Sequence, residues 1–423
     1  APPTRPHPLF SAAAAGRSAL ATLAAAVIFG RLLARGTWKA GLTAAAAFGA
    51  AGFRVLCVDP APPVTDEAAE GADIRTTAFL QPSIPVLEAA GLWARLAPHA
   101  APLQVMRIVD AGGREPVARI VRDFDASDVS DQPFGWNLPN WLLRREMVAR
   151  LAELPNVEFR PGTATAGVTA RDDAALVRLS DGGQVAARLL VAADGRNSAV
   201  RQALGIGVRT TRYGQKAVVF AVTHQVPHDN VSTEIHRSGG PFTLVPLPDR
   251  DGRPASAIVW MERGPEAERL AALPVPDFEA AITERSCGLF GPLTLTSRRA
   301  VWPIIGQTAD RMTARHTALI AEAAHVVPPI GAQGLNMSLA DLRALLDLAA
   351  KAPESLGSAE MLAAYEKRRH LDVQVRARGI DLLNRASMLE PQPLRDLRAG
   401  VLGALYGIAP VRRALMRAGL GVR

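Results

Sequence analysis

Three stretches of the sequence place a carboxylate close to glycines, a combination suited to holding a phosphorylated nucleotide. In GTWKAGLTAAAAFGAAGFRVLCVDP, Gly36 and Gly41 flank a turn, and an alanine-rich helix and an apolar strand lead to Asp59. A dinucleotide site needs three glycines between strand and helix, and an acid about 20 residues later for a ribose hydroxyl. Trp38 stands where the second glycine is expected. Alone, the stretch leaves dinucleotide binding and a plain helix–strand pair equally open.

The other two stretches are also strand–turn–helix junctions. In LLVAADGRNSAVRQALG a strand ends at Asp194, Gly195 turns the chain, and a helix follows. In ALIAEAAHVVPPIGAQGLNMSLADL an apolar strand delivers Glu322, and a Pro/Gly loop feeds a helix predicted to begin near Leu335 or Asn336. Backbone N–H groups at a helix start carry partial positive charge, so this third junction suits an electron-rich ligand.

His325, in the third stretch, is a candidate acid or base. That role needs partners within reach, and the favoured interpretation is a histidine bonded locally to backbone. The sequence shows neither a cluster of metal ligands nor a G-x-S-x-G nucleophile elbow. No metal site and no catalytic side chain are therefore predicted.

The elements around these stretches predict an α/β nucleotide domain in several pieces, interrupted by a mostly antiparallel sheet. Residues 73–97 have helical spacing, and LQVMRIVDAGGREPVARIV reads as a hairpin. Residues 214–263 are strongly β, and residues 359–423 are mostly helical.

Composition excludes several classes of protein. The net charge of the 423 residues is +8, but the arginines are scattered, so no nucleic-acid partner is expected. Two cysteines cannot form a disulfide framework, which favours a reducing compartment. The best candidate for a membrane span, ALATLAAAVIFG, is too short and is similar to the core of a signal or transit peptide. Residues 1–35 are expected to form an atypical, disordered leader.

Together and in this order, the motifs resemble the flavin-dependent aromatic hydroxylases of the p-hydroxybenzoate hydroxylase fold. The likeness is closest to the branch that hydroxylates the ring during ubiquinone biosynthesis, and it covers roughly residues 40–420. The stretches that carry it are DIRTTAFLQPSIPVLEAAGLW, ADGRNSAVR, AEAAHVVPPIGAQGLNMSLAD, and YEKRRHLDV with DLLNR. The first of them is similar to an arginine-containing helix that follows the second strand in this family.

The resemblance implies an α/β fold with a discontinuous, Rossmann-like FAD-binding domain, a mostly antiparallel β-sheet substrate domain and C-terminal helices. The expected boundaries are 36–100, 138–208 and 296–350 for the FAD-binding domain, 101–137 and 209–295 for the substrate domain, and 351–423 for the helical region.

The resemblance also implies contacts with FAD. Gly36 and Gly41 would lie at the pyrophosphate, and Asp59 would bind the adenosine ribose. Arg75 and Arg145 would contact the phosphate–ribityl region. Asp194 and Gly195 would lie near both FAD and the nicotinamide donor. Glu322 would bind the ribityl or pyrophosphate part, and Pro329, Gly331, Gln333, Gly334, Leu335 and Asn336 would wrap the isoalloxazine.

Departures from the family pattern are Trp38 and Lys39 in the first loop, GRLLAR as a poor first strand, Ala321 in place of a glycine, and the reversed Gly–Ala order in IGAQG.

The activity implied is that of a FAD-dependent monooxygenase that hydroxylates the ring of a polyprenylated phenol in ubiquinone biosynthesis. It would use NAD(P)H and O2 through a flavin C4a-hydroperoxide. Trp38 motivates one alternative, a catalytically impaired relative that acts as a scaffold in the ubiquinone-biosynthesis complex. Another is a reductase or halogenase of the same fold, but the lysine motif of such halogenases is not found in the sequence.

The expected partners are a hydrophobic prenylated phenol and other enzymes of ubiquinone biosynthesis. The expected location is the cytoplasm, with peripheral contact at the inner face of the cell membrane left open. From Leu397 onward the chain has five arginines and no acid, which suits an anionic membrane surface. A plain basic packing helix is the favoured alternative.

Overall fold

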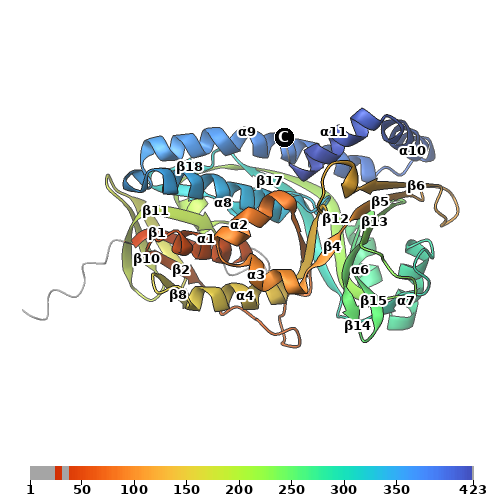
Figure 1. Cartoon of the computed structure of the whole chain (residues 1–423), viewed down its shortest axis with the longest axis horizontal. Helices are drawn as coiled ribbons and strands as arrows, with labels where there is room; N and C mark the ends of the chain where they lie inside the picture. Colours follow the sequence, from red (N-terminus) through yellow and green to blue (C-terminus); the bar gives the residue numbers. More distant parts are fainter. Residues whose placement is uncertain (1–23, 31–37, 422–423) are drawn as a thin grey trace, which may run out of the picture.

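A mostly parallel sheet and a mostly antiparallel sheet lie side by side, with helices on their outer faces (Figure 1). The computed structural model describes residues 24–30 and 38–421. This arrangement confirms the α/β fold with a Rossmann-like part, an antiparallel part and C-terminal helices. The domain boundaries given above remain predictions.

The first sheet has the strand order β18-β19-β11-β1-β2-β8, and β19, β11, β1, β2 and β8 run parallel. Its strands are β1 (Ala24–Gly30), β2 (Val55–Asp59), β8 (Val157–Pro161), β9 (Thr165–Ala170), β10 (Ala175–Leu179), β11 (Gln184–Ala193), β18 (Thr313–Ala314) and β19 (Thr317–Leu319). The helix α1 (Trp38–Ala50) connects β1 to β2 and packs against both strands. Every residue of β2 is buried, as expected for a parallel strand covered on both faces.

The strand β1 corrects the expectation that residues 1–35 form a leader. It lies between β11 and β2, with Ala26 opposite Val55 and Phe29 opposite Val58. An apolar run too short to span a membrane has the right length for a strand, and here the chain uses part of it as a parallel strand between two others. The remaining residues of 1–35, and Gly36, lie outside the described residues.

The second sheet has the order β20-β17-β12-β15-β14-β13-β5-β6, antiparallel except where β13 meets β5. Its strands are β5 (Val105–Asp110), β6 (Ile120–Asp125), β12 (Val208–Thr223), β13 (Val231–His236), β14 (Pro241–Arg250), β15 (Arg253–Arg263), β16 (Thr294–Leu295), β17 (Ala300–Ala309) and β20 (His325–Val326). The pairing of β5 with β6 confirms the predicted hairpin. Side chains on one face of this sheet form a separate apolar core with α6 (Gly264–Ala272) and α7 (Val275–Arg285).

A small third sheet, β3-β7-β4, joins the two large sheets. It consists of β3 (Thr76–Leu80), β4 (Ala101–Leu103) and β7 (Gly135–Pro139). Residues 73–97 are therefore not one helix: β3 precedes the short helices α2 (Ile84–Ala89) and α3 (Trp93–Leu96). Arg75 lies directly before β3 and not on a helix, which corrects the expectation from the resemblance.

The remaining helices cover the sheets and complete the C-terminal region. They are α4 (Asn140–Ala152), α5 (Ala199–Ala203), α8 (Gln333–Lys351), α9 (Ala359–Ser387), α10 (Gln392–Gly407) and α11 (Ala409–Leu420). The helix α8 packs against α1 and α9, so its N-terminus is fixed beside β3. The helices α10 and α11 lie at the far end of the molecule, beside β5 and β6 (Figure 1).

Candidate active site

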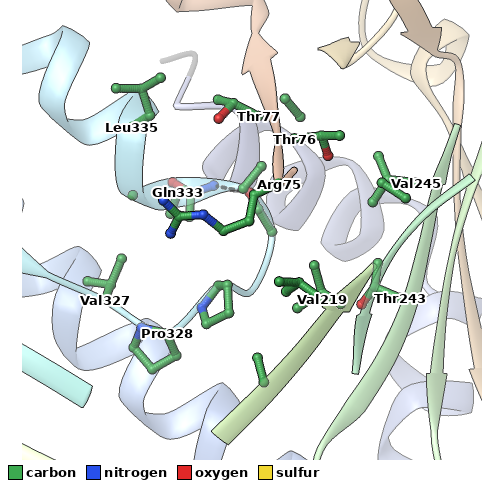
Figure 2. A pocket seen from close by; sticks show the side chains of 18 of the residues that line it. Arg75, Thr76, Thr77, Val219, Thr243, Val245, Val327, Pro328, Gln333 and Leu335 are labelled. Carbon is green, nitrogen blue, oxygen red and sulfur yellow. Dashed lines mark hydrogen bonds between the residues drawn. The ribbon is translucent and has the colours of Figure 1, made fainter. Parts of the chain in front are cut away.

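A cavity of ≈ 370 Å³ lies between the loop before α8, β3 and the second sheet. Figure 2 shows Gln333, Leu335 and Arg75 on one side of it and Val219 and Val245 on the other. One part of the wall is polar and charged, and includes Lys39, Arg75, Asn140, Arg196 and Glu322. The part on the second sheet is apolar, and includes Val219, Phe220, Val245 and Val259. The cavity thus joins a charged region to an apolar one.

The loop before α8 forms one side of the cavity. Gly331 and Ala332 both have a left-handed backbone, with φ of 61° and 56°. The helix begins at Gln333, two residues before the predicted start, and no side chain caps its first turn. Its first N–H groups are therefore available to an electron-rich ligand. A Cβ atom added at Gly334 would meet no atom within 4 Å, so there is space beside the backbone for a planar ring.

Asn336 holds this loop against β3 and does not line the cavity. Its Oδ1 accepts from the backbone N–H of Leu80 at 2.8 Å and from the Ser83 hydroxyl at 2.7 Å. Its Nδ2 donates to the carbonyls of Ala78 at 2.8 Å and Ala332 at 2.6 Å. All the hydrogen-bonding groups of its side chain have partners, so the side chain positions the loop, and the expected contact of Asn336 with the isoalloxazine remains a prediction.

Gln333 links the same loop to the C-terminal helices. Its Nε2 donates to the carbonyl of Gly331 at 3.0 Å and to that of Gly419 in α11 at 2.9 Å. Figure 2 labels Gln333 among the residues that line the cavity.

A buried chain of hydrogen bonds connects α1, α4 and β3 at the charged end of the cavity. The Lys39 Nζ donates to Thr77 Oγ1 at 2.7 Å and to Asn140 Oδ1 at 2.8 Å. Asn140 Nδ2 donates to Asp73 Oδ2 at 3.0 Å, and Arg75 makes a two-point ion pair with Asp73 at 2.8 Å. These contacts hold two cationic side chains at the cavity wall.

Burial controls the protonation of this cluster. Loss of hydration lowers the pKa of Lys39 to about 7, although Asp73 opposes the shift. Burial also raises the pKa of Glu322, against the attraction of Arg75. Burial disfavours charge on Asp73, but Arg75 and Lys39 outweigh it and hold the pKa of that carboxyl well below its usual range. An entering anion would restore full charge on Lys39, so the cluster fits phosphate groups.

Lys39 was noted in the sequence only as a departure from the family pattern. A cationic residue directly after the glycine-poor turn, at a helix start, was the available signal. The side chain of Trp38 lies outside the part of the chain that the structure describes.

Arg145 does not reach the cavity. Its Nε donates to Glu146 Oε1 at 2.9 Å, and its guanidinium lies over Trp141. The preceding residue, Arg144, is buried, and burial lowers the pKa of its guanidinium. The negative charges of Asp73 and Asp59 oppose this shift. On a helix, neighbouring residues point about 100° apart, so a shift of one position decides which arginine faces inward.

Four other predicted residues lie outside the cavity lining. Gly41 is within α1, and Asp59 ends β2, where its Oδ1 accepts from the N–H of Ala61 at 3.0 Å. Burial raises the pKa of Asp59 to about 6. Asp194 accepts from the Ser198 hydroxyl and, at 3.1 Å, from the N–H of Val200, so it stabilises the turn at Gly195.

The other predicted residues are brought together at the cavity wall: Arg75, Glu322, Pro329, Gly331, Gln333, Gly334 and Leu335. Their contacts with FAD remain predictions.

His325 belongs to a buried ionic network beneath the loop. Its Nε2 lies 2.6 Å from Asp341 Oδ2, and Arg369 Nε donates to Asp341 Oδ1 at 2.8 Å. The expectation that it bonds locally to backbone is therefore wrong, because its partner is a carboxylate of α8 that is 16 residues away. Asp341 Oδ2 also accepts from the N–H of Ala321, whose φ is 55°. The network fixes the turn that carries Glu322.

Within the described residues, no group of three or more His, Cys, Asp or Glu side chains is placed to hold a metal ion. In the same part of the chain, no helix is long and apolar enough to cross a membrane.

Comparison with known proteins gives consistent matches over most of the chain. A family model described as an FAD binding domain matches residues 36–378. The ubiquinone hydroxylase UbiL of Rhodospirillum rubrum is 33% identical over 387 residues, which are 90% of this chain and 87% of that protein. The 3-demethoxyubiquinol 3-hydroxylase of Escherichia coli is 27% identical over 374 residues, 88% of this chain and 93% of that protein.

Solved structures agree with these matches. PqsL of P. aeruginosa in complex with 2-aminobenzoylacetate has a TM-score of 0.74 at 25% identity, over 90% of this chain and all of that one. The p-nitrophenol 4-monooxygenase PnpA of Pseudomonas putida has a TM-score of 0.75 at 18% identity, over 96% of this chain and all of that one, which is a likeness of fold alone.

Proposed function

Because the chain belongs to the family of FAD-binding monooxygenases that includes ubiquinone hydroxylases, we propose that it hydroxylates the aromatic ring of a polyprenylated phenol in ubiquinone biosynthesis, with NAD(P)H as electron donor. The observation that carries this proposal is the cavity whose charged end adjoins an apolar end. The charged end suits the phosphates of FAD, and the apolar end suits a hydrophobic ring. FAD, when bound, supplies the redox and oxygen chemistry.

Each part of the cavity wall has a separate task in this proposal. The uncapped start of α8 would place its backbone N–H groups beside the ring system of bound FAD, where they would favour negative charge. Arg75 and Lys39 hold phosphate oxygens, and Trp302 supports Arg75, whose Cζ lies 4.3 Å from the ring centroid. The apolar side chains of the second sheet orient the phenol and exclude water. No side-chain nucleophile is required.

The first test is the visible spectrum of the purified protein, followed by reconstitution with FAD and phenol-dependent oxidation of NAD(P)H. Hydroxylated product, detected by mass spectrometry, is the expected result. A coloured protein that oxidises NAD(P)H without hydroxylating any prenylated phenol would contradict the proposed substrate.

A substitution at Gly334 tests the location of the ring system. Gly334→Val fills space that is open in the structure, so the fold should persist while flavin is excluded. Gly400→Val on α10, where a Cβ atom also meets open space, is the matched control and should keep its flavin. Unchanged flavin content in Gly334→Val would contradict this placement.

The alternative is a catalytically impaired relative that acts as a scaffold for other enzymes of ubiquinone biosynthesis. The feature that favours it is Trp38, the first residue of α1, where the family pattern has a glycine. A colourless protein that cannot be reconstituted with FAD but binds those enzymes would support it.

For either role we propose a cytoplasmic protein that contacts the inner face of the cell membrane, where a prenylated substrate resides. Support comes from the exposed apolar side chains of α9, α10 and α11. In α11, Met416 and Leu420 pack against Phe134, so these helices bury one side as well.

A further inference from the structure

A second cavity, of ≈ 450 Å³, lies on the opposite face of the second sheet from the first. Consecutive residues of a strand point to opposite faces: Val259 lines the first cavity, whereas Trp260 packs in the core under α6 and α7. The residues around the second cavity are Gly113, Arg114, Arg237, Ser238, Trp260, Glu262, Arg285 and Arg395. They come from the β5–β6 hairpin, the second sheet, α7 and α10.

The lining of this cavity carries an excess of positive charge. Four arginines and one carboxylate, that of Glu262, line it, and one of these arginines, Arg237, is paired with Glu284 outside the lining. Nearby carboxylates already have partners: Asp110 accepts from Arg119 and Arg398, and Glu284 pairs with Arg237 at 3.1 Å. Burial lowers the pKa of Arg285 to about 10, and the charges of Arg237 and Arg398 act in the same direction. An anion in the cavity would relieve this repulsion.

Trp260 lines the same cavity and carries an unsatisfied donor. The residue is 5% exposed, and its indole Nε1 has no hydrogen-bond partner among the described residues. Buried tryptophan N–H groups usually have an acceptor, so the arginines and the indole together form an incomplete site for an oxyanion.

The helix beside the cavity is apolar on its outer side. Its exposed side chains Leu394, Leu397, Val401 and Leu405 are 41, 63, 48 and 40% exposed. Their spacing of three and four residues places them in one stripe along α10. Arg395, in the cavity wall, is adjacent in sequence to Leu394, and Gln392 Nε2 fixes this helix to the hairpin by donating to the Gly112 carbonyl at 3.0 Å.

We propose that the second cavity binds the phosphate of an anionic phospholipid while the α10 stripe rests in the outer part of the acyl layer. A soluble phosphate ligand would not account for a row of large apolar side chains next to the arginines, whereas a lipid accounts for both. The inference gives a specific site to the proposed surface contact and does not depend on flavin or on the identity of the phenol.

The test uses the full-length protein, with and without FAD, in flotation with vesicles of phosphatidylcholine alone or mixed with phosphatidylglycerol. We expect binding that requires phosphatidylglycerol. The double variant Arg114→Gln/Arg395→Gln should bind roughly 30-fold more weakly, from the usual contribution of two surface arginines near anionic lipid. Trp260→Phe removes only the indole donor and should weaken binding about threefold.

The matched control is Arg54→Gln/Arg178→Gln, which makes the same change in net charge on the first sheet, far from α10. It should change vesicle binding less than twofold, flavin absorbance should be unchanged in every variant, and thermal unfolding should be unchanged in the arginine variants, whereas Trp260→Phe should lower the unfolding temperature slightly because it shrinks a core side chain. Equal losses in the control and the cavity variants would show non-specific electrostatics and overturn the site. Titration with glycerol phosphate separates the sources: binding of that compound without any preference for anionic vesicles would overturn the lipid assignment.

Discussion

Two loop–helix junctions meet at the main cavity, and they present positive charge in different ways. At the start of α8, Gly331 and Ala332 turn the chain so that backbone N–H groups of an uncapped helix face the cavity. At the start of α1, the glycine expected in the loop is replaced, and the side chain of Lys39 reaches the cavity wall. The partial positive charge of the backbone at the start of α8 is fixed, whereas the charge at the start of α1 depends on whether the amine of Lys39 is protonated.

The difference predicts which end of the cofactor site is sensitive to pH. Partial charges of backbone groups do not titrate, so the α8 junction should act equally at all ordinary pH values. The pKa of Lys39 is about 7, so the α1 junction should weaken as pH rises. Substitutions at the two junctions can separate these contributions.

The largest effect should come from breaking the network beneath the α8 junction. Arg369→Met removes one of the two ion-pair partners of the buried Asp341 carboxylate and leaves only His325. The substitution should lower the free energy of unfolding by about 3–5 kcal/mol. Urea unfolding measures this change. Arg368→Met, next to it but half-exposed and paired with Asp347, should cost less than about 0.5 kcal/mol. Equal effects would mean that the network does not support the junction.

At the α1 junction, Lys39→Met should weaken FAD binding roughly 10- to 100-fold at pH 7, because a charged hydrogen bond to phosphate is lost. Quenching of flavin fluorescence during titration of the apoprotein gives the affinity. Lys351→Met, at the exposed end of α8, serves as the control and should bind FAD normally. If Lys39→Met binds as tightly as the unmodified protein, Lys39 does not hold the phosphates.

The pH dependence should distinguish the two junctions directly. In the empty site Lys39 is mostly neutral above pH 7, and its charged neighbours are Asp73, Arg75, Arg144 and Glu322. A bound phosphate favours the protonated amine, so binding takes up a proton, and affinity should fall by up to about tenfold per pH unit above 7.

The same titration of Lys39→Met should show a flatter profile over pH 7–9. Parallel profiles for the two proteins would assign the dependence to another group.

The smallest effect concerns the backbone of the α8 junction. Ala332 has a left-handed conformation that costs an L-residue more than glycine, so Ala332→Gly should raise the free energy of unfolding by about 0.5–1 kcal/mol. Ala340→Gly, inside α8, should lower it by about 1 kcal/mol. Thermal and urea unfolding of both variants test whether the left-handed backbone of Ala332 is strained. A loss of stability in Ala332→Gly equal to that in Ala340→Gly would contradict this strain.

Motifs with strong local signals were predictable from the sequence. The order of strand, glycine loop and helix predicted the α8 junction and singled out Glu322, and the resemblance singled out Arg75; both residues line the cavity. The first strand was missed because Ala24–Gly30 is apolar without periodicity, and such a run has the same composition in a leader and in a buried strand.

Side-chain partners that are distant in the sequence were not predictable. His325 pairs with Asp341 and Arg369 only because α8 and α9 pack against each other. Arg144, and not Arg145, faces inward because the phase of α4 is set by its packing against α1. The role of Lys39 depends on Asn140 and Thr77, which come from elements that the sequence could not place beside it.

The amide of Gln333 has a mechanical consequence. Because one nitrogen donates both to the loop at Gly331 and to Gly419 near the end of α11, the outermost helix and the innermost loop are braced by a single group. A force on α11, such as docking against another body, is therefore transmitted to the rim of the cavity over the length of one side chain.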